Sequence, residues 1–204
     1  MNKNWIEYPL VLDGNTIRLV SLETSHYDAL FELAKDKRLW EHIPTDCSDR
    51  KTFNKVYNSA LEQRLKGNHY PFVIQNKRGE LIGSTRFFEI FPEDKKLEIG
   101  WTWIIQKYWG TVVNLECKLL LLSYCFEKLG IRRVQIKTDA NNVRSRKAIE
   151  KIGGHFEGIL RKDKIKSNGE SRSAAYYSII DEEWVDKKRN LELLIKKLNL
   201  ESPK

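Results

Sequence analysis

The residues Lys107–Asn114 (KYWGTVVN) stand between a strand-like run and a long apolar helical pattern. The first amides of a helix have no intrahelical acceptor, and together with the helix dipole they attract an anion such as a pyrophosphate. A cradle of backbone groups restricts side chains only where φ must be positive or the ligand comes close, and Gly110 is the one glycine here. These residues alone therefore permit a pyrophosphate site but favour a plain turn.

A second polar segment, from Asp139 to Gly153, begins where a predicted strand ends and a predicted helix starts. Asn142 or Asn141 can cap that helix, and Ser145 lies one turn inside it. Capping a helix does not prevent a residue from contacting a ligand, so one residue can do both. The segment is therefore a second candidate for a binding site.

Other kinds of site find little support in the sequence. The four histidines are isolated, and no cysteine–histidine cluster has the spacing of a zinc site. The chain has no GxxxxGKS/T, GxGxxG or GxSxG motif, which argues against a nucleoside triphosphate site, a dinucleotide site and a serine hydrolase. We therefore expect no metal site.

The formal net charge of +8 favours polyanionic partners such as nucleic acid, a membrane surface or a phosphate-rich cofactor. Much of the excess lies in residues 187–197, where the solvated face of a helix is the simpler interpretation. Asn2, Lys3 and Asn4 interrupt any initial apolar run, and the longest aliphatic run, Leu119–Leu122, is too short to span a membrane. Three cysteines without paired spacing favour a reduced compartment, so we expect a cytoplasmic protein.

The elements that position these residues follow from changes in hydrophobic period. Strand patterns cover residues 16–22, 70–75, 81–90, 97–104, 133–138, 155–161 and 173–180, and helical patterns cover 24–33, 49–65, 115–129, 142–152 and 181–198. The unit from Leu97 to Thr138 is long enough for a parallel crossover. Trp101 and Trp103 alternate with polar residues, which indicates core positions. We predict an α+β fold around one mixed sheet.

Several separated motifs resemble, in order and spacing, the RimJ/RimL-like branch of the GNAT acetyltransferase superfamily. They read EIGW, YWGTVVNLECK, NVRSRKAIEKIG, EGILR and YYSI, at residues 98–101, 108–118, 142–153, 157–161 and 176–179. The resemblance covers most of the chain. It implies a single acetyltransferase domain over residues 1–204, with about 182–204 as a C-terminal helical extension.

The resemblance implies a GNAT-type fold, in which a mixed, mostly antiparallel sheet flanked by helices contains a parallel strand pair that splays apart. Acetyl-CoA, the implied co-substrate, would lie between the splayed strands, here residues 98–104 and 133–138. The positions implied to bind it are Ile104, Trp109, Gly110, Thr111, Val112, Val113, Asn114, Asn142, Ser145 and Arg146.

The loop departs from the family pattern Q/R-x-x-G-x-G/A at all three signature positions. Val112 stands at the place of the central glycine, so we expect a Cβ to face the cradle. Backbone amides are the expected ligands, and the resemblance therefore still implies binding. It also implies that Asn142 binds the pantetheine arm or a water near the thioester, and that Ser145 lies near the sulfur or the pyrophosphate. Arg144, Arg146 and Lys147 are candidates to meet the adenosine 3′-phosphate, and a solvated basic face is an equally good interpretation of each.

For catalysis, the resemblance implies direct attack of a primary amine on the acetyl thioester. Glu98, on the strand that leads into the loop, is the candidate base; an ordinary exposed carboxylate is an equally good interpretation, and Glu89 is a weaker rival. Backbone amides near Ile104 are candidates to hold the oxyanion. Ile149 stands where many family members carry a tyrosine acid, so Ser145 is the candidate to assist the departing thiol.

The predicted acceptor is a primary amine, either a protein N-terminus or a small molecule. We expect no stable nucleic-acid or membrane partner, and a monomer or homodimer. Two other functions remain open. Val112 and Ile149 suggest a catalytically weak CoA-binding regulator. The charge and the six tryptophans suggest a basic nucleic-acid-binding protein, although no RNA-recognition, helix-turn-helix or zinc-finger signature is present.

Overall fold

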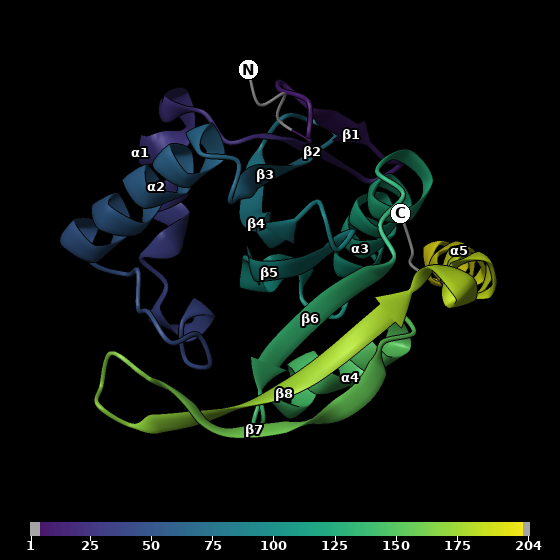
Figure 1. Ribbon diagram of the computed structural model, residues 1–204. Coiled ribbons are helices and arrows are strands. Elements are labelled where there is room, and N and C mark those ends of the chain that lie inside the picture. The colour runs from purple at the N-terminus through teal and green to yellow at the C-terminus, as the bar shows by residue number, and fades with distance from the viewer. Residues whose placement is uncertain (1–4, 202–204) are drawn as a thin grey trace.

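The computed structural model describes residues 5–201 and contains one eight-stranded sheet with helices on both faces (Figure 1). Asn2, Lys3 and Asn4 lie outside the described residues. The spatial order of the strands is β1-β2-β3-β4-β5-β6-β8-β7, and only the β5–β6 pair is parallel. The strands are β1 Val11–Asp13, β2 Ile17–Ser21, β3 Tyr70–Asn76, β4 Leu81–Phe91, β5 Lys96–Ile104, β6 Arg133–Asp139, β7 His155–Ile165 and β8 Ser171–Ile180. The predicted mixed, mostly antiparallel sheet is confirmed.

The helices divide between the two faces of this sheet. The five α-helices are α1 Tyr27–Ala34, α2 Arg50–Leu65, α3 Val113–Ser123, α4 Val143–Lys151 and α5 Asp181–Glu201. A π-helical segment, Tyr124–Lys128, continues α3. Helices α3, α4 and α5 contribute to the main hydrophobic cluster, whereas α1 and α2 build a second cluster. The C-terminal helix is thus part of the main core, through Trp184, Leu191 and Ile195.

Strand β3 shows how alternation along a strand separates the two clusters. Phe72 and Ile74 belong to the main cluster, whereas Val73 between them belongs to the second cluster. Successive side chains of a strand point to opposite faces, so an apolar run fills both layers. Strand β3 is therefore covered on both of its faces.

Three differences from the predicted elements have physical causes. Strand β1 is short and lies at the edge of the sheet, so it carries little hydrophobic pattern. The first helix begins as a 3-10 turn at Thr24–His26 before α1. Strand β7 continues beyond Arg161 to Ile165, because it pairs with β8 while most of its side chains remain exposed. An exposed edge strand needs no apolar alternation, and periodicity therefore misses its second half.

The parallel pair β5–β6 separates soon after it begins. Pairing joins Lys96–Glu98 to Arg133–Gln135 only. Beyond that point β5 remains paired with β4 up to Ile104, and β6 remains paired with β8 up to Asp139. Trp101 has a φ of 52°, and the β4–β5 register shifts nearby, so the backbone of β5 turns away from β6 here. The expected splayed pair is confirmed.

A buried carboxylate, Glu116, links helix α3 to the turn between β1 and β2. Glu116 accepts hydrogen bonds from the backbone amides of Asn15, Thr16 and Ile17, at 2.5, 2.8 and 3.1 Å. Its side chain is buried. Three backbone donors satisfy this carboxylate without a cation, so Glu116 fixes the N-terminal turn of α3 relative to the β1–β2 turn.

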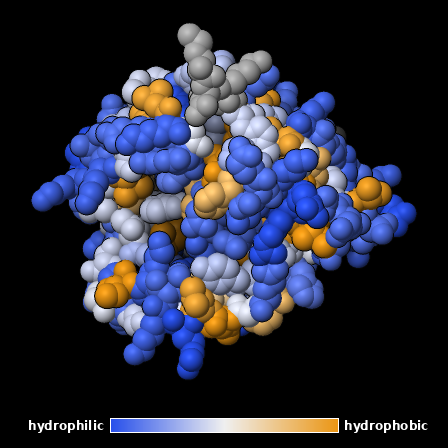
Figure 2. Space-filling model, viewed as in Figure 1, coloured by the Kyte–Doolittle hydropathy of each residue, from blue (hydrophilic) through white to orange (hydrophobic). Residues whose placement is uncertain are grey.

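The surface is mostly polar. Figure 2 shows one face on which small hydrophobic patches are separated by hydrophilic side chains. Among residues 5–201, no helix is both long and apolar enough to cross a membrane. Cys47, Cys117 and Cys125 are buried and form no disulfide.

Candidate active site

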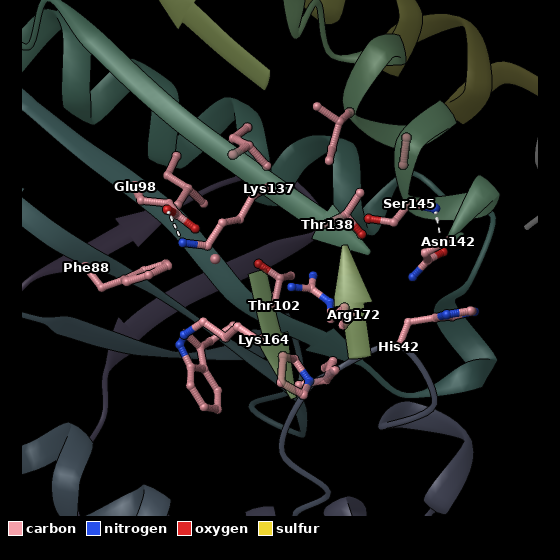
Figure 3. A pocket seen from close by; sticks show the side chains of 18 of the residues that line it. His42, Phe88, Glu98, Thr102, Lys137, Thr138, Asn142, Ser145, Lys164 and Arg172 are labelled. Atoms are coloured by element: carbon pink, nitrogen blue, oxygen red, sulfur yellow. Dashed lines mark hydrogen bonds and ion pairs between the residues drawn. The ribbon is translucent and has the colours of Figure 1, made fainter. Parts of the chain in front are cut away.

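A cavity of about 350 Å³ lies where β5 and β6 separate (Figure 3). Strands β5 and β6 and helices α3 and α4 line most of it, and residues 42–45, Phe88, the end of β7 and Arg172 contribute the rest. Glu98 and Lys137 lie at one end in Figure 3, with Asn142 and Ser145 at the other. The splay therefore opens a lined cavity in the middle of the sheet.

A second cavity of about 190 Å³ continues the first toward the KYWGTVVN loop. Both cavities share lining residues, among them Thr102, Asn114, Asn142 and Ser145. The second cavity is also lined by Ile104, Trp109, Gly110 and Arg144. Together they form one cleft, which runs from the N-terminal turn of α3 to Glu98.

The loop before α3 has the geometry of an anion cradle. Gly110 has a φ of 75°, and no atom lies within 4 Å of the position that a Cβ would occupy. Thr111 donates its hydroxyl to the Tyr108 carbonyl. The amide of Glu116 donates to the carbonyl of Val112, so the helical ladder starts there. The amides of Thr111 and Val113 are already hydrogen-bonded, and the other first amides of the helix remain for an anion. The glycine meets the one positive-φ position of this turn.

The Val112 side chain does not face the loop, although the family pattern led us to expect that it would. Its φ and ψ are −64° and −19°, which are ordinary helical values. Its side chain packs against the main hydrophobic cluster, and it lines neither cavity. The expectation that its Cβ faces the cradle is therefore wrong, because the helical backbone turns this side chain toward the core.

Trp109 holds the loop against β5 and carries an arginine. Its indole Nε1 donates to the Ile104 carbonyl at 2.6 Å. The Arg144 guanidinium carbon lies 3.6 Å from the centre of a Trp109 ring, a cation–π distance. This contact places an exposed cation at the second cavity, beside the loop that carries Gly110.

Asn142 and Ser145 are brought together at the start of α4. The Asn142 Oδ1 accepts a hydrogen bond from the Ser145 amide at 2.9 Å, so Asn142 is the helix cap. Both residues also line both cavities. Arg146 lies elsewhere: it donates to the Tyr177 hydroxyl at 3.0 Å and lines neither cavity. Of the two arginines, Arg144 faces the cleft, and a cofactor contact by Arg146 stays a prediction.

Glu98 is buried in the cleft, with an exposed fraction of only 1%. Its carboxylate accepts from Gln135 Nε2 at 2.7 Å and lies 3.0 Å from Lys137 Nζ. Burial raises the pKa of Glu98 to about 7, although Lys137 and Gln135 act in the opposite direction. The interpretation as an ordinary exposed carboxylate is therefore wrong. Glu89, the rival, is half exposed, lies 3.5 Å from Lys137 and does not line the main cavity.

A family model for the acetyltransferase (GNAT) domain matches residues 16–155. The chain belongs to the GNAT family. It is 27% identical over 165 residues to the uncharacterized N-acetyltransferase YnaD of Bacillus subtilis, covering 79% of this chain and 92% of that protein. It is 25% identical over 176 residues to the ribosomal-protein-serine acetyltransferase of Escherichia coli, covering 82% and 95%.

A solved GNAT structure agrees with the fold. The structure of Mycobacterium smegmatis RimJ in complex with CoA-disulfide superposes with a TM-score of 0.76 and covers 90% of this chain and 91% of that one, at 19% identity. These matches agree with the RimJ/RimL-like branch that the motifs indicate. The fold of this GNAT protein is thus supported by an independent structure.

Several residues of the GNAT site escaped the sequence analysis. Lys137 and Lys118 both line the main cavity, as does Thr102. Two spacings could have revealed them: Gln135 and Lys137 are two apart on a strand, and Asn114 and Lys118 are four apart on a helix. Residues from distant segments, such as 42–45 and the end of β7, carry no local signal.

Trp101 also differs from the sequence-based prediction. Trp103 is buried in the second cluster, as expected. Trp101 is only half-buried, lines the main cavity and lies under Arg86, 4.5 Å from the guanidinium carbon. Its left-handed backbone breaks the alternation, so it faces the cleft of the GNAT fold rather than the core.

The cleft fits a CoA thioester by its own geometry. It offers the open space beside Gly110 and the amides of the α3 turn to an anion, and the second cavity, lined by Asn142 and the end of β5, to an extended chain. Within residues 5–201, no group of three or more potential metal ligands comes together. The donor set suits a phosphate-bearing thioester.

Proposed function

We propose that this protein transfers an acetyl group from acetyl-CoA to a primary amine. One observation carries the proposal: a continuous cleft leads from an anion cradle at a helix N-terminus, through a gap between two parallel strands, to a buried carboxylate of raised pKa. The family membership of the chain supports the same reaction class. Cytoplasmic location and oligomeric state stay predictions.

The residues of the chain would divide the work along the cleft. The first amides of α3 would hold the pyrophosphate, and Arg144 on Trp109 would meet phosphate charge at the mouth. Asn142, Ser145 and Asn114 line the passage that an extended pantetheine arm needs. Bound acetyl-CoA supplies the activated acyl carbon, and the walls of the cleft exclude competing water.

Glu98 is the proposed base. An ammonium acceptor must lose a proton before its nitrogen can bond to the acyl carbon, and Glu98 would receive that proton directly or through water. The new carbon–nitrogen bond leaves a second proton on the nitrogen. This proton would pass through the Ser145 hydroxyl to the sulfur as the carbon–sulfur bond breaks, so that CoA leaves as the thiol and the hydroxyl is restored. Ser145 is the proposed donor to the departing sulfur, because it lines both cavities and its amide, not its hydroxyl, binds Asn142.

The pKa of the base favours some amines over others. Glu98 has a pKa of about 7. Transfer from an α-ammonium of pKa about 8 costs about 1.4 kcal/mol, whereas transfer from a lysine ammonium of pKa about 10.4 costs about 4.6 kcal/mol. We therefore propose an acceptor of low pKa, either a protein N-terminus or a small-molecule amine.

A contact between the β7–β8 turn and residues 42–45, which line the main cavity, limits the size of that amine. The β7–β8 turn contacts the segment at 42–45: Ser167 donates its amide to the Pro44 carbonyl at 2.9 Å, and the Asp46 amide donates to the Ser167 hydroxyl at 3.1 Å. The Escherichia coli relative is a ribosomal-protein-serine acetyltransferase, which supports a protein acceptor. The contact between the β7–β8 turn and the segment at 42–45 instead favours a slender chain end or a small molecule.

Calorimetric titration with acetyl-CoA, CoA and 3′-dephospho-CoA tests the proposal, followed by thiol release on a panel of amines and N-terminal peptides. We expect binding weakened by loss of the 3′-phosphate, and turnover with amines of low pKa. Binding without turnover on any acceptor would favour a CoA-binding regulator. No CoA binding, together with RNA binding that falls steeply with salt, would favour a nucleic-acid-binding protein.

A further inference from the structure

Lys118 is a buried lysine inside the cleft. Its exposed fraction is 5%, and its Nζ donates a hydrogen bond to the Thr102 hydroxyl at 2.8 Å. Among residues 5–201 it forms no ion pair within 4.0 Å. It is therefore a buried amine whose hydrogen-bond partner is a neutral hydroxyl.

A lysine buried in this way lowers the stability of the fold, and a purely structural role does not require it. A buried cation without a counter-charge is strongly disfavoured, and replacing it by an apolar residue of similar volume is often neutral or stabilising. Burial lowers the pKa of the Lys118 ammonium, with a small opposing effect from the thiol of Cys117. Helix α3 already has Val113, Leu115, Cys117, Leu121 and Leu122 in the core, so a contact to β5 does not require an amine.

The position of Lys118 connects the cradle to the reacting end of the cleft. Asn114 and Lys118 are one helical turn apart on α3, and both line the main cavity. Thr102 follows the left-handed Trp101, just beyond the last β5–β6 pair at Glu98. Lys118 thus lines the gap between the splayed strands, where the acyl group of bound acetyl-CoA would lie.

The hydrogen bonds around Lys118 leave donors free for a ligand. The Thr102 hydroxyl lies 2.7 Å from the Thr85 hydroxyl and also accepts from Lys118. A lysine amine has at least two N–H groups and an ammonium has three. With one group on Thr102, at least one more remains for an oxygen in the cavity.

We propose that Lys118 donates a hydrogen bond to the thioester carbonyl oxygen of bound acetyl-CoA and stabilises the negative charge that develops there. This rests on the proposed function. When the amine nitrogen bonds to the acyl carbon, the carbonyl π pair moves onto this oxygen, and it returns as the carbon–sulfur bond breaks. Lys118 keeps its proton throughout. A preorganised donor at a developing oxyanion accelerates acyl transfer by about 10²- to 10³-fold.

The carbonyl resonance of 1-¹³C-labelled acetyl-CoA tests the contact without any acceptor. Hydrogen bonding polarises the carbonyl, so we expect this ¹³C resonance to move downfield when the wild-type protein binds the ligand. In the Lys118→Met variant the bound resonance should return toward its free position, while the dissociation constant changes by less than about threefold. Lys128→Met, an exposed lysine outside both cavities, should leave the shift unchanged.

Steady-state kinetics provide a second readout. Lys118→Met should lower kcat by roughly 100-fold with little change in KM. Lys118→Gln, which keeps an N–H donor, should restore part of both kcat and the ¹³C shift. A purely structural lysine would instead alter the melting temperature and leave the shift alone.

The outcomes separate this inference from the proposed function. Binding of acetyl-CoA with an unshifted carbonyl in the wild-type protein would overturn the role of Lys118 and leave the acetyltransferase proposal intact. An equal shift in the wild type and in Lys118→Met would do the same. Failure of the wild-type protein to bind acetyl-CoA would overturn both.

Discussion

The ammonium nitrogen of Lys137 lies 3.0 Å from the Glu98 carboxylate, across the last point at which β5 and β6 are paired. Lys137 also lies 5.5 Å from the centre of the Phe88 ring and 3.5 Å from Glu89. The pair therefore marks the end of the cleft where an acceptor would meet the acyl group. The two carboxylates beside Lys137 differ sharply in burial, because Glu98 is buried and Glu89 is half exposed. This difference can be tested.

Glu98→Gln should remove the acidic limb of the pH profile. Because the pKa of Glu98 is raised to about 7, its basic form is present above about pH 7 and is lost as the pH falls through that value. Wild-type kcat/KM should thus decrease on acidification. At about pH 8 the variant should be slower by about 100-fold, the usual contribution of a positioned base. The measurement is kcat/KM from about pH 5.5 to 9.

Glu89→Gln is the matched control, since Glu89 contacts the same lysine from the surface. It should leave the acidic limb in place. An unchanged profile for Glu98→Gln, or loss of the limb in Glu89→Gln alone, would transfer the role of base to Glu89.

Arg144 and Arg146 offer a matched test on one helix. Arg144 lies on Trp109 at the second cavity, whereas Arg146 binds the Tyr177 hydroxyl outside both cavities. Arg144→Gln should weaken CoA binding by about 1 kcal/mol, roughly fivefold, because an exposed phosphate contact is screened by water. Arg146→Gln should change it by less than twofold. Calorimetry decides between them, and a larger effect at Arg146 would refute this assignment of the phosphate contact.

Val112→Gly should not improve cofactor binding, although it restores the usual family residue. The Val112 side chain packs on the core and lines neither cavity. The variant should lose about 1–2 kcal/mol of unfolding free energy, through lost packing and the greater chain entropy of glycine. The dissociation constant for CoA should stay within about twofold. A tenfold tighter complex would show that the valine does obstruct the cradle.

Glu116→Ala should destabilise the fold by about 3 kcal/mol, because three backbone amides lose a buried acceptor. Glu116→Gln should cost less, since one oxygen remains to accept. Urea unfolding measures both changes. A loss below about 0.5 kcal/mol in Glu116→Ala would mean that the β1–β2 turn contributes little to holding α3.

Most of the elements were predictable from local pattern. Helix α2 has Asp49 as its cap, and the Asp49 side chain accepts a hydrogen bond from the Thr52 amide, as the residue types suggest. The alternation of β5 and the apolar stripe of α3 also gave elements of the correct type. The left-handed Trp101 was not predictable, because local alternation continues through it and only the β4–β5 register reveals the irregularity.

The features of the site also divide into those that the sequence predicted and those that only the tertiary structure decided. Sequence alone determined the glycine of the loop, a helix cap at Asn141 or Asn142 and the membership of Glu98 in the strand before the loop, since these depend on local conformation and on motifs. Tertiary structure decided that Glu98 is buried beside Lys137, that Val112 points into the core, that Arg144 rather than Arg146 faces the cleft, and that Lys118 lies beneath the gap. Burial and pKa depend on which distant segments cover a side chain, and spacing along the chain does not contain that information.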